Sequence, residues 1–291
     1  MSAPIISNIS DTARWVAVYR AMETERPDAI FRDPYARRLA GPRGEAIVKG
    51  MPRGEQMAWA MIVRTAVMDE ILMRVIDSGE VDCVLNLAAG LDARPWRLPL
   101  PASLQWFDVD HFEMIDLKTR ELGAERTACR YEGVPLDLAN REERRALFDR
   151  VNATARRVLL ITEGLLVYLP AEGVGELAED LHAQPNFRLW LMDLASPGLL
   201  KMLSKRWGKG LAAAKLPFQF GPAEGTGFFS PYGWREAEWR SQIHEGLRLD
   251  RVFPLARLWM FVGRFMGKRR QAEFRRFSGI ALLARNGQSG G

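Results

Sequence analysis

Short apolar runs alternate along the chain with longer segments in which apolar residues recur every three or four positions. The short runs are rich in valine, leucine and isoleucine, as are strands that are buried on both faces of a parallel sheet. The longer segments have the spacing of amphipathic helices that cover such a sheet. Because strand and helix alternate at the intervals of βαβ units, the pattern predicts a doubly wound, mainly parallel, Rossmann-like α/β sheet with ligands at its carboxyl edge.

The pattern also sets the expected order of elements. Predicted strands lie at residues 81–87, 104–110, 129–136, 156–162, 187–193, 248–252 and 278–285. Predicted helices lie at residues 12–24, 33–41, 54–76, 114–118, 141–151, 171–183, 231–245 and 255–274. We expect a single domain over residues 1–291, with an N-terminal helical region at 1–80 that folds over the carboxyl edge. Residues 196–230 interrupt the rhythm, and we interpret them as an inserted helical cap.

Acidic residues stand at or just after the ends of four predicted strands. They are Asp92, Asp110 with Asp108 before it, Asp137 and Glu163. In a doubly wound sheet these positions converge on the crevice where the strand order reverses. Each acid alone can equally be a helix cap, but four in series favour a ligand site. Asp110 also has the spacing from the first strand at which a carboxylate can accept a hydrogen bond from a ribose hydroxyl.

The loop after the first predicted strand restricts the type of ligand. It contains neither the G-x-G-x-x-G pattern nor a P-loop lysine, so pyrophosphate cofactors and nucleoside triphosphates fit poorly. This disfavours an NAD-linked oxidoreductase. A ligand that contains an adenosine and no phosphate fits better.

One arginine lies on the apolar face of the predicted helix 54–76. Arg64 is in line with Met57, Met61, Met68 and Ile71 at helical spacing. Because a guanidinium stays charged and is costly to bury without a partner, Arg64 must find an anion. Two interpretations stay open: a structural ion pair with a core carboxylate, or binding of a ligand carboxylate.

Composition limits the class of protein. The chain has 291 residues, of which 47% are apolar and 26% charged, as in ordinary globular proteins. Cys83 and Cys129 lie in apolar runs, which indicates buried thiols in a reducing compartment. Two distant cysteines and three scattered histidines cannot build a zinc site, so we expect no metal.

The N-terminus lacks a signal peptide pattern and no window has the apolar length of a membrane span, so we expect a cytoplasmic protein.

The net charge of +5 is carried largely by the C-terminal part of the chain, where Lys268 to Arg270 and Arg275 with Arg276 cluster. No aromatic-basic recognition motif accompanies them, so we expect no nucleic acid partner. The predicted helix 255–274 is amphipathic with a basic end, and two interpretations follow. It is part of the cap or covers the sheet, or it lies in a lipid headgroup layer and gives the protein a non-catalytic or membrane-surface role. The sequence carries no signal of oligomeric state.

Several motifs taken together resemble a known family. They are Thr12-Ala13 through Arg20-Ala21, Arg32-Asp33-Pro34-Tyr35-Ala36, Val63-Arg64-Thr65, Asn86 through Arg94, Phe107 through Asp110, Thr162 through Leu169, and Phe229 with Pro231 and Gly233-Trp234. The chain resembles, over nearly its whole length, the leucine carboxyl methyltransferase-like branch of the class I S-adenosylmethionine-dependent methyltransferases, with its many bacterial small-molecule O-methyltransferases. The Asp-Pro-Tyr and Thr-Glu-Gly-Leu-Leu runs are not general Rossmann features.

The resemblance implies S-adenosylmethionine as the cofactor and assigns roles to its binding residues. Gly90 lets the backbone approach the methionine part, and Arg64 pairs with the methionine carboxylate. Asp110 accepts hydrogen bonds from the ribose hydroxyls. Asp137 and Leu138 flank the adenine.

Further positions follow from the same resemblance. Glu163 faces the amino end of the cofactor, and Tyr168 lines the acceptor pocket beneath the cap. In the first loop Asp92 matches the family pattern, whereas Ala88 stands where the family commonly has glycine and Ala93 where threonine is common.

The resemblance implies a small-molecule acceptor with a carboxylate or a hydroxyl. A carboxylate is already ionised at pH 7 and needs no general base, whereas a phenol or alcohol needs one or depends on its ionised fraction. His111 is the nearest candidate base, and its other interpretation is a surface histidine at the start of a helix. We therefore expect carboxyl O-methylation, with hydroxyl O-methylation as the alternative.

Overall fold

A computed structural model describes residues 9–51, 54–213, 217–253, 255–263 and 267–287. The expectations for the first seven residues and for the tail beyond residue 287 lie outside these ranges. Within them, no helix combines the length and the apolar character that crossing a bilayer requires.

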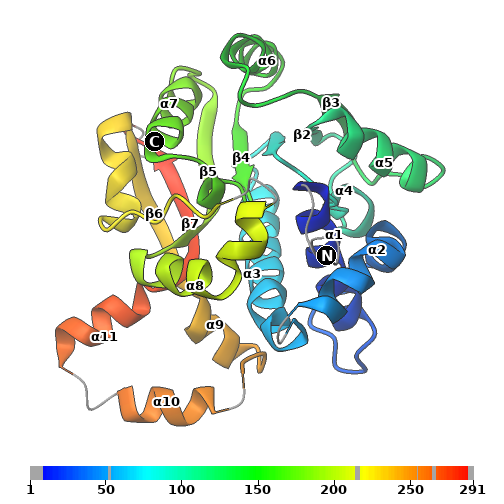
Figure 1. The fold of residues 1–291 in the computed structure, drawn as a ribbon. Helices are drawn as coiled ribbons and strands as arrows, with labels where there is room; N and C mark the ends of the chain where they lie inside the picture. Colours follow the sequence, from blue (N-terminus) through cyan, green and yellow to red (C-terminus); the bar gives the residue numbers. More distant parts are fainter. Residues whose placement is uncertain (1–8, 52–53, 214–216, 254, 264–266, 288–291) are drawn as a thin grey trace.

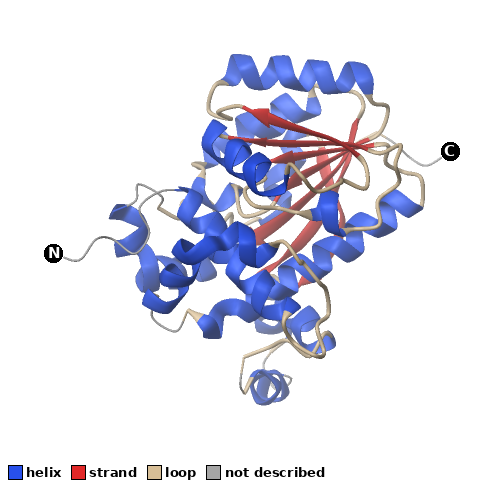
Figure 2. Cartoon of the chain, turned by 90° about the vertical axis from the view of Figure 1, so that its right-hand side faces the viewer, coloured by secondary structure: helices blue, strands red, loops and turns tan. Residues whose placement is uncertain are grey.

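The centre of the fold is a sheet in the order β3-β2-β1-β4-β5-β7-β6 (Figures 1 and 2). Its strands are β1 (Cys83–Leu87), β2 (Gln105–Asp110), β3 (Arg130–Pro135), β4 (Val158–Thr162), β5 (Phe187–Ala195), β6 (Trp234–Ser241) and β7 (Ser278–Arg285). The first five pair in parallel, β7 is antiparallel to β5, and β6 is antiparallel to β7. The predicted mainly parallel sheet is confirmed, and its strand order reverses between β1 and β4.

Helices cover both faces of the sheet (Figure 2). Side chains of α3 (Ala58–Asp77) pack on one face against Val84, Trp106 and Leu159. Side chains of α6 (Arg141–Thr154) and α7 (Ala171–His182) pack on the other face against Leu85 and Leu160. Successive residues of a strand point to opposite faces, so double coverage explains why β1 and β4 are buried along their whole length.

Smaller elements complete the chain. They are α4 (Arg94–Arg97), α5 (Phe112–Leu122), α8 (Pro197–Ala213), and the 3-10 helices η1 (Glu55–Met57), η2 (Leu166–Tyr168) and η3 (Gly225–Tyr232). The predicted cap segment holds α8 and most of η3. The cap is therefore helical, as expected.

The N-terminal helices α1 (Ile9–Thr24) and α2 (Ala36–Gly50) share an apolar cluster with the start of α3. The predicted stop at Gly41-Pro42 is confirmed for the first helical run of α2, because the backbone of Gly41 is not helical. Gly41 takes φ 60°, a left-handed conformation open to glycine, and Pro42 then starts a second helical run. This second run, which continues to Gly50 after the kink, is not among the predicted elements.

The C-terminal third contains three further corrections. The predicted helix 231–245 is wrong: its first part is strand β6, and only its end joins α9 (Gln242–Arg248). The predicted strand 248–252 is also wrong. The predicted helix 255–274 is two helices, α10 (Ala256–Gly263) and α11 (Lys268–Arg275). Edge strand β6 has charged residues on its open side and a register shift between Glu236 and Glu238, which makes its sequence look like an amphipathic helix.

A fully buried ion pair ties α5 to the sheet. Lys118 Nζ lies 2.7 Å from Asp108 Oδ2, and neither side chain is exposed. The same carboxylate accepts hydrogen bonds from Trp106 Nε1 at 2.7 Å and Asn86 Nδ2 at 3.0 Å. Burial raises the pKa of Asp108, and the neighbouring ammonium of Lys118 opposes that rise. Such a pair is costly to break by removing one partner, because the other charge stays buried.

We therefore expect Lys118→Met to lower the free energy of unfolding by about 3–5 kcal/mol. The control is Arg120→Met on the same helix, whose pair with Asp116 is largely exposed and contributes about 0–1 kcal/mol. Guanidinium unfolding followed by circular dichroism measures both. Equal, small losses in the two variants would contradict a structural role for the buried pair.

Candidate active site

A cavity of about 850 Å³ lies at the carboxyl ends of the parallel strands, where the strand order reverses. The loops after β1, β2, β4 and β5 form one side, and residues of α1, α3 and α8 form the other. Ligand sites of α/β sheets lie at this position. The volume is near the upper end of the ~300–1,000 Å³ found for small-molecule sites.

The structure brings all the predicted site residues to this one cavity. Its walls include Arg64, Ala88, Gly90, Asp92, Asp110, Asp137, Leu138, Glu163 and Tyr168. They come from α3 and from the ends of β1, β2, β3 and β4. Residues up to 104 positions apart in the sequence therefore share one site.

The end of β2 places a carboxylate under the first loop. Asp110 Oδ2 accepts a hydrogen bond from the Gly90 backbone N–H at 2.7 Å, and its Oδ1 accepts from the His111 N–H at 2.8 Å. Gly90 has φ +51°, so the loop turns sharply above the acid. The carboxylate is 7% exposed and faces the cavity with its orientation fixed by two backbone donors.

Ala88 leaves β1 in a left-handed conformation with φ 54°. This conformation costs an L-residue other than glycine about 1–2 kcal/mol. The next residue, Ala89, donates its N–H to Val109 O at 3.1 Å and so fastens the loop to β2. The wall of the cavity therefore carries local backbone strain where glycine would fit without it.

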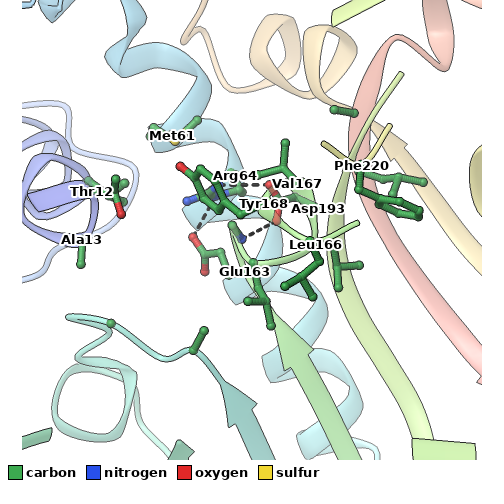
Figure 3. Close-up of a pocket in the computed structure, with 18 of the residues that line it drawn as sticks. Thr12, Ala13, Met61, Arg64, Glu163, Leu166, Val167, Tyr168, Asp193 and Phe220 are labelled. Atoms are coloured by element: carbon green, nitrogen blue, oxygen red, sulfur yellow. Dashed lines mark hydrogen bonds and ion pairs between the residues drawn. The ribbon is translucent and has the colours of Figure 1, made fainter. Parts of the chain in front are cut away.

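Arg64 projects from α3 to the ends of β4 and β5 (Figure 3). Its Nε lies 2.9 Å from Glu163 Oε1, and its Nη1 lies 3.1 Å from Asp193 Oδ2. The side chain is 9% exposed. Burial alone would lower the pKa of Arg64, but the two carboxylates raise it above its usual value. The arginine thus forms structural ion pairs and also lines the cavity.

A second buried arginine shares the same glutamate. Arg94 Nη1 lies 2.9 Å from Glu163 Oε2 and 2.7 Å from Asp92 Oδ2, and Arg94 Nε lies 2.6 Å from Asp69 Oδ1. Burial would raise the pKa of Glu163, but Arg94 and Arg64 together hold it below its ordinary value. Glu163 is therefore a carboxylate anion and not a general acid.

The network continues through Asp92 towards β2. Asn86 Nδ2 donates to Asp92 Oδ2 at 3.1 Å and to Asp108 Oδ1 at 3.0 Å. Burial would raise the pKa of Asp92, but Arg94 and then Lys118 lower it well below its usual range. The loop after β1 is thus fastened by Asn86 of β1 and by charged groups of β2, α3, α4 and α5 and of the loop after β4.

Sequence reasoning missed three residues of this site. Asp193 lies two residues before the end of β5 and accepts hydrogen bonds from Arg64 and from the Gly164 N–H, the latter at 2.7 Å. The rule that selected the other strand-end acids could have found it. Asp69 lies inside α3 without such a signal. Thr65 also lies on α3, and its buried hydroxyl in the cavity wall has no hydrogen-bond partner among the described residues.

The part of the cavity beyond Arg64 is apolar. Side chains such as Met61, Val167 and Phe220 line it (Figure 3). Phe218 lines it as well, and Tyr168 stacks on Phe218 with 5.6 Å between ring centres. Burial raises the pKa of Tyr168 to about 12, although Arg64 opposes the rise. Its hydroxyl is therefore protonated at physiological pH and is not a base.

The remaining polar groups of the apolar part are engaged with the protein. Gln242 donates its Nε2 to Ala60 O at 2.6 Å, and its Oε1 accepts a hydrogen bond from Ser278. His111 stands at the start of α5 after β2, on the other side of β1 from β4 and Tyr168. Among the described residues, no three histidines, cysteines or acids form a group that could hold a metal ion.

Comparison with known proteins gives the cavity a family context. Residues 13–182 match the model of the family described as leucine carboxyl methyltransferase. A protein of Frankia alni with the provisional name of an S-adenosyl-L-methionine-dependent methyltransferase is 33% identical over 242 residues, which cover 79% of this chain and 83% of that protein. A provisionally named relative of the same kind from Streptomyces avermitilis is 31% identical and covers 78% and 83%.

Solved structures confirm the fold. A DUF574 family protein from Streptomyces avermitilis superimposes with a TM-score of 0.58 at 15% identity, over 92% of this chain and 96% of that one. A provisionally named methyltransferase from Thermobifida fusca gives a TM-score of 0.59 at 13% identity, over 97% and 96%. At these identities the likeness concerns the architecture alone. The family match and the curated relatives carry the assignment: the chain belongs to the leucine carboxyl methyltransferase family and is an S-adenosylmethionine-dependent methyltransferase.

Proposed function

We propose that the enzyme transfers the methyl group to the carboxylate oxygen of a small molecule with an apolar body. The observation that carries this proposal is the division of the cavity. One part holds charged side chains and backbone donors, and the other is apolar and contains no unengaged base among its described residues.

The polar part fits the cofactor. Asp110, whose carboxylate is already oriented by Gly90 and His111, would accept from the ribose hydroxyls. Asp137 and Leu138 follow β3 and line the same cavity, and they would flank the adenine. The unsatisfied hydroxyl of Thr65 is a buried polar group that a ligand can pair, which supports a polar ligand at this place.

The methionine end would lie towards Arg64 and Glu163. Nε and Nη1 of Arg64 are engaged by Glu163 and Asp193, so a ligand carboxylate would meet the remaining nitrogen. Glu163 is an anion held by two arginines, and its negative charge suits an ammonium group. Asp92, Ala88 and Gly90 would shape the loop close to the ligand backbone.

Bound S-adenosylmethionine supplies an electrophilic methyl group on a positively charged sulfur, which is also the counter-charge for an anionic acceptor. The chain's own part is to hold the acceptor oxygen in line and to exclude water. An ionised carboxylate needs no proton removed, which agrees with the absence of an unengaged base among the described lining residues. The apolar walls strengthen the attraction between opposite charges.

Asp110→Asn should raise the Kd of S-adenosylhomocysteine by about 10- to 100-fold, because a hydrogen bond to a charged group contributes about 1.5–3 kcal/mol. Isothermal titration calorimetry measures this. Asp116→Asn, on the exposed side of α5, is the control and should bind normally. Unchanged binding by Asp110→Asn would remove the ribose role.

Thr65→Val should weaken cofactor binding by about tenfold while the free protein becomes no less stable. The hydroxyl has no protein partner to lose, and removing an unsatisfied buried polar group saves its desolvation cost of about 1–3 kcal/mol. Calorimetric titration and guanidinium unfolding of the same variant separate the two effects. A loss of stability with unchanged affinity would show that the hydroxyl serves the fold.

With a carboxylate acceptor, kcat/KM should be level between about pH 6 and 9, since carboxyl groups ionise near pH 4. Tyr168, with its pKa raised to about 12, stays protonated across this range, so Tyr168→Phe should leave the shape of the profile unchanged. A phenol acceptor that depends on its ionised fraction would instead give a rate that rises about tenfold per pH unit. Rates for panels of aromatic and aliphatic acids and phenols decide between the two acceptors.

A further inference from the structure

The positive charge of the chain is concentrated beside the apolar part of the cavity. Residues 267–277 contain five basic residues and one acidic residue, so the remaining chain, with 36 basic and 35 acidic residues, is nearly neutral. Within this segment Lys268, Arg270 and Arg275 form no ion pair with any residue that the structure describes. A local excess of unpaired basic groups attracts an anionic surface.

Exposed apolar side chains gather at the same place. The most exposed large apolar residues of the described chain are Phe112, Met202, Leu255, Leu258 and Phe274, which are between 40% and 66% exposed. All but Phe112 belong to α8, α10 and α11 or directly precede α10. Neighbouring basic and apolar side chains are the composition of segments that lie in a lipid headgroup layer.

The arrangement of the helices presents these residues outwards. In Figure 1, α10 and α11 extend from the body beyond α8 and α9. No residue of α11 is buried, so this helix covers no part of the core. The prediction that the segment covers the sheet does not hold for α11.

Two of the exposed apolar residues also belong to the cavity. Phe274 and Met202 line its wall and are 40% and 45% exposed. We define the basic-apolar rim as Met202, Leu255, Leu258, Phe274 and the basic residues of 267–277. It meets the apolar part of the cavity at Met202 and Phe274.

We propose that this basic-apolar rim docks onto an anionic lipid bilayer. Lysine and arginine near the rim would meet the headgroups, and the leucine, methionine and phenylalanine side chains would enter the boundary with the acyl chains. A nucleic acid fits less well, because aliphatic leucine and methionine offer no stacking surface for bases. The docking itself does not depend on the acceptor; the consequence that an apolar acceptor enters from the bilayer rests on the proposed function.

Co-sedimentation with phosphatidylcholine vesicles, with and without phosphatidylglycerol, tests the docking on the full chain. We expect binding to the anionic vesicles that falls as salt is raised. K268E/R270E/R275E should reduce the partition coefficient at least about tenfold, since each basic residue near such a surface contributes several-fold. The control K49E/R130E/R156E makes the same change of net charge at exposed basic residues elsewhere and should retain most of the binding.

A second pair of variants tests the apolar contribution. Leu258→Ser and Phe274→Ser should weaken binding that persists at high salt, whereas Phe112→Ser, an equally exposed residue on α5, should not. Light scattering without vesicles shows whether the protein forms a dimer, and a single-stranded RNA competitor shows whether the rim binds RNA instead of lipid. Four outcomes would each overturn the proposal. They are loss of binding in the control charge variant, no preference for anionic vesicles, a dimer that shields the rim, and RNA binding without vesicle binding.

The thermal shift caused by S-adenosylhomocysteine keeps this test separate from the proposed function. K268E/R270E/R275E and Leu258→Ser should show the same shift as the original protein, because none of these residues lines the cavity. Vesicle binding without methylation of any carboxylic acid would leave the docking in place and remove the acceptor assignment. Methylation of carboxylic acids without vesicle binding would keep the acceptor assignment and remove the docking.

Discussion

Fold and site both depend on a line of buried ion pairs across the carboxyl edge of the sheet, in which the neutral amide of Asn86 bridges two of the carboxylates. It runs from Lys118 through Asp108, Asn86 and Asp92 to Arg94, and through Glu163 to Arg64 and Asp193. Isolated buried charges are costly, but each group here has at least one close polar partner. Because the line joins α5, β2, β1, β4, α3 and β5, a group removed for its role in binding also loosens the sheet edge that shapes the cavity.

Of the two interpretations of Arg64, the structural ion pair is shown by this line, and under the proposed function the same arginine also meets the ligand carboxylate. The guanidinium has a fixed fork of donors, and two protein carboxylates occupy Nε and Nη1. The structural pairs hold the group in one orientation at the cavity wall, so an incoming anion meets a donor that is already oriented and little side-chain entropy remains to be lost. An arginine that the protein's own carboxylates already hold in place is therefore better suited to binding an anion than one that is mobile in the free protein.

The sequence predicts much of this arrangement because two rules are local. Strands buried on both faces appear as continuous apolar runs, and acids at the ends of parallel strands share one edge. The edge strand β6 follows neither rule, since most of its charged residues are partly buried in ion pairs and its register shifts between Glu236 and Glu238. Asp69 and Thr65 could not be found from spacing, because a helix position becomes part of the site only when α3 packs at a particular rotation on the sheet. Gly41-Pro42 shows the same limit, as a kink and a helix end have one local signature.

The contrast between the two parts of the cavity bears on the reaction as a whole. Transfer of a methyl group to a carboxylate turns an anion and a cation into two neutral products, so charge is lost along the path and a water-poor wall favours the change. In the proposed reaction the acceptor leaves as an ester, which is more apolar than the acid that entered. An opening lined by Met202 and Phe274 suits such a product better than a charged channel would. If the rim lies on a bilayer, an apolar ester moves more favourably into the lipid than into water. The loss of charge that favours the transfer in a water-poor site therefore also favours release of the product.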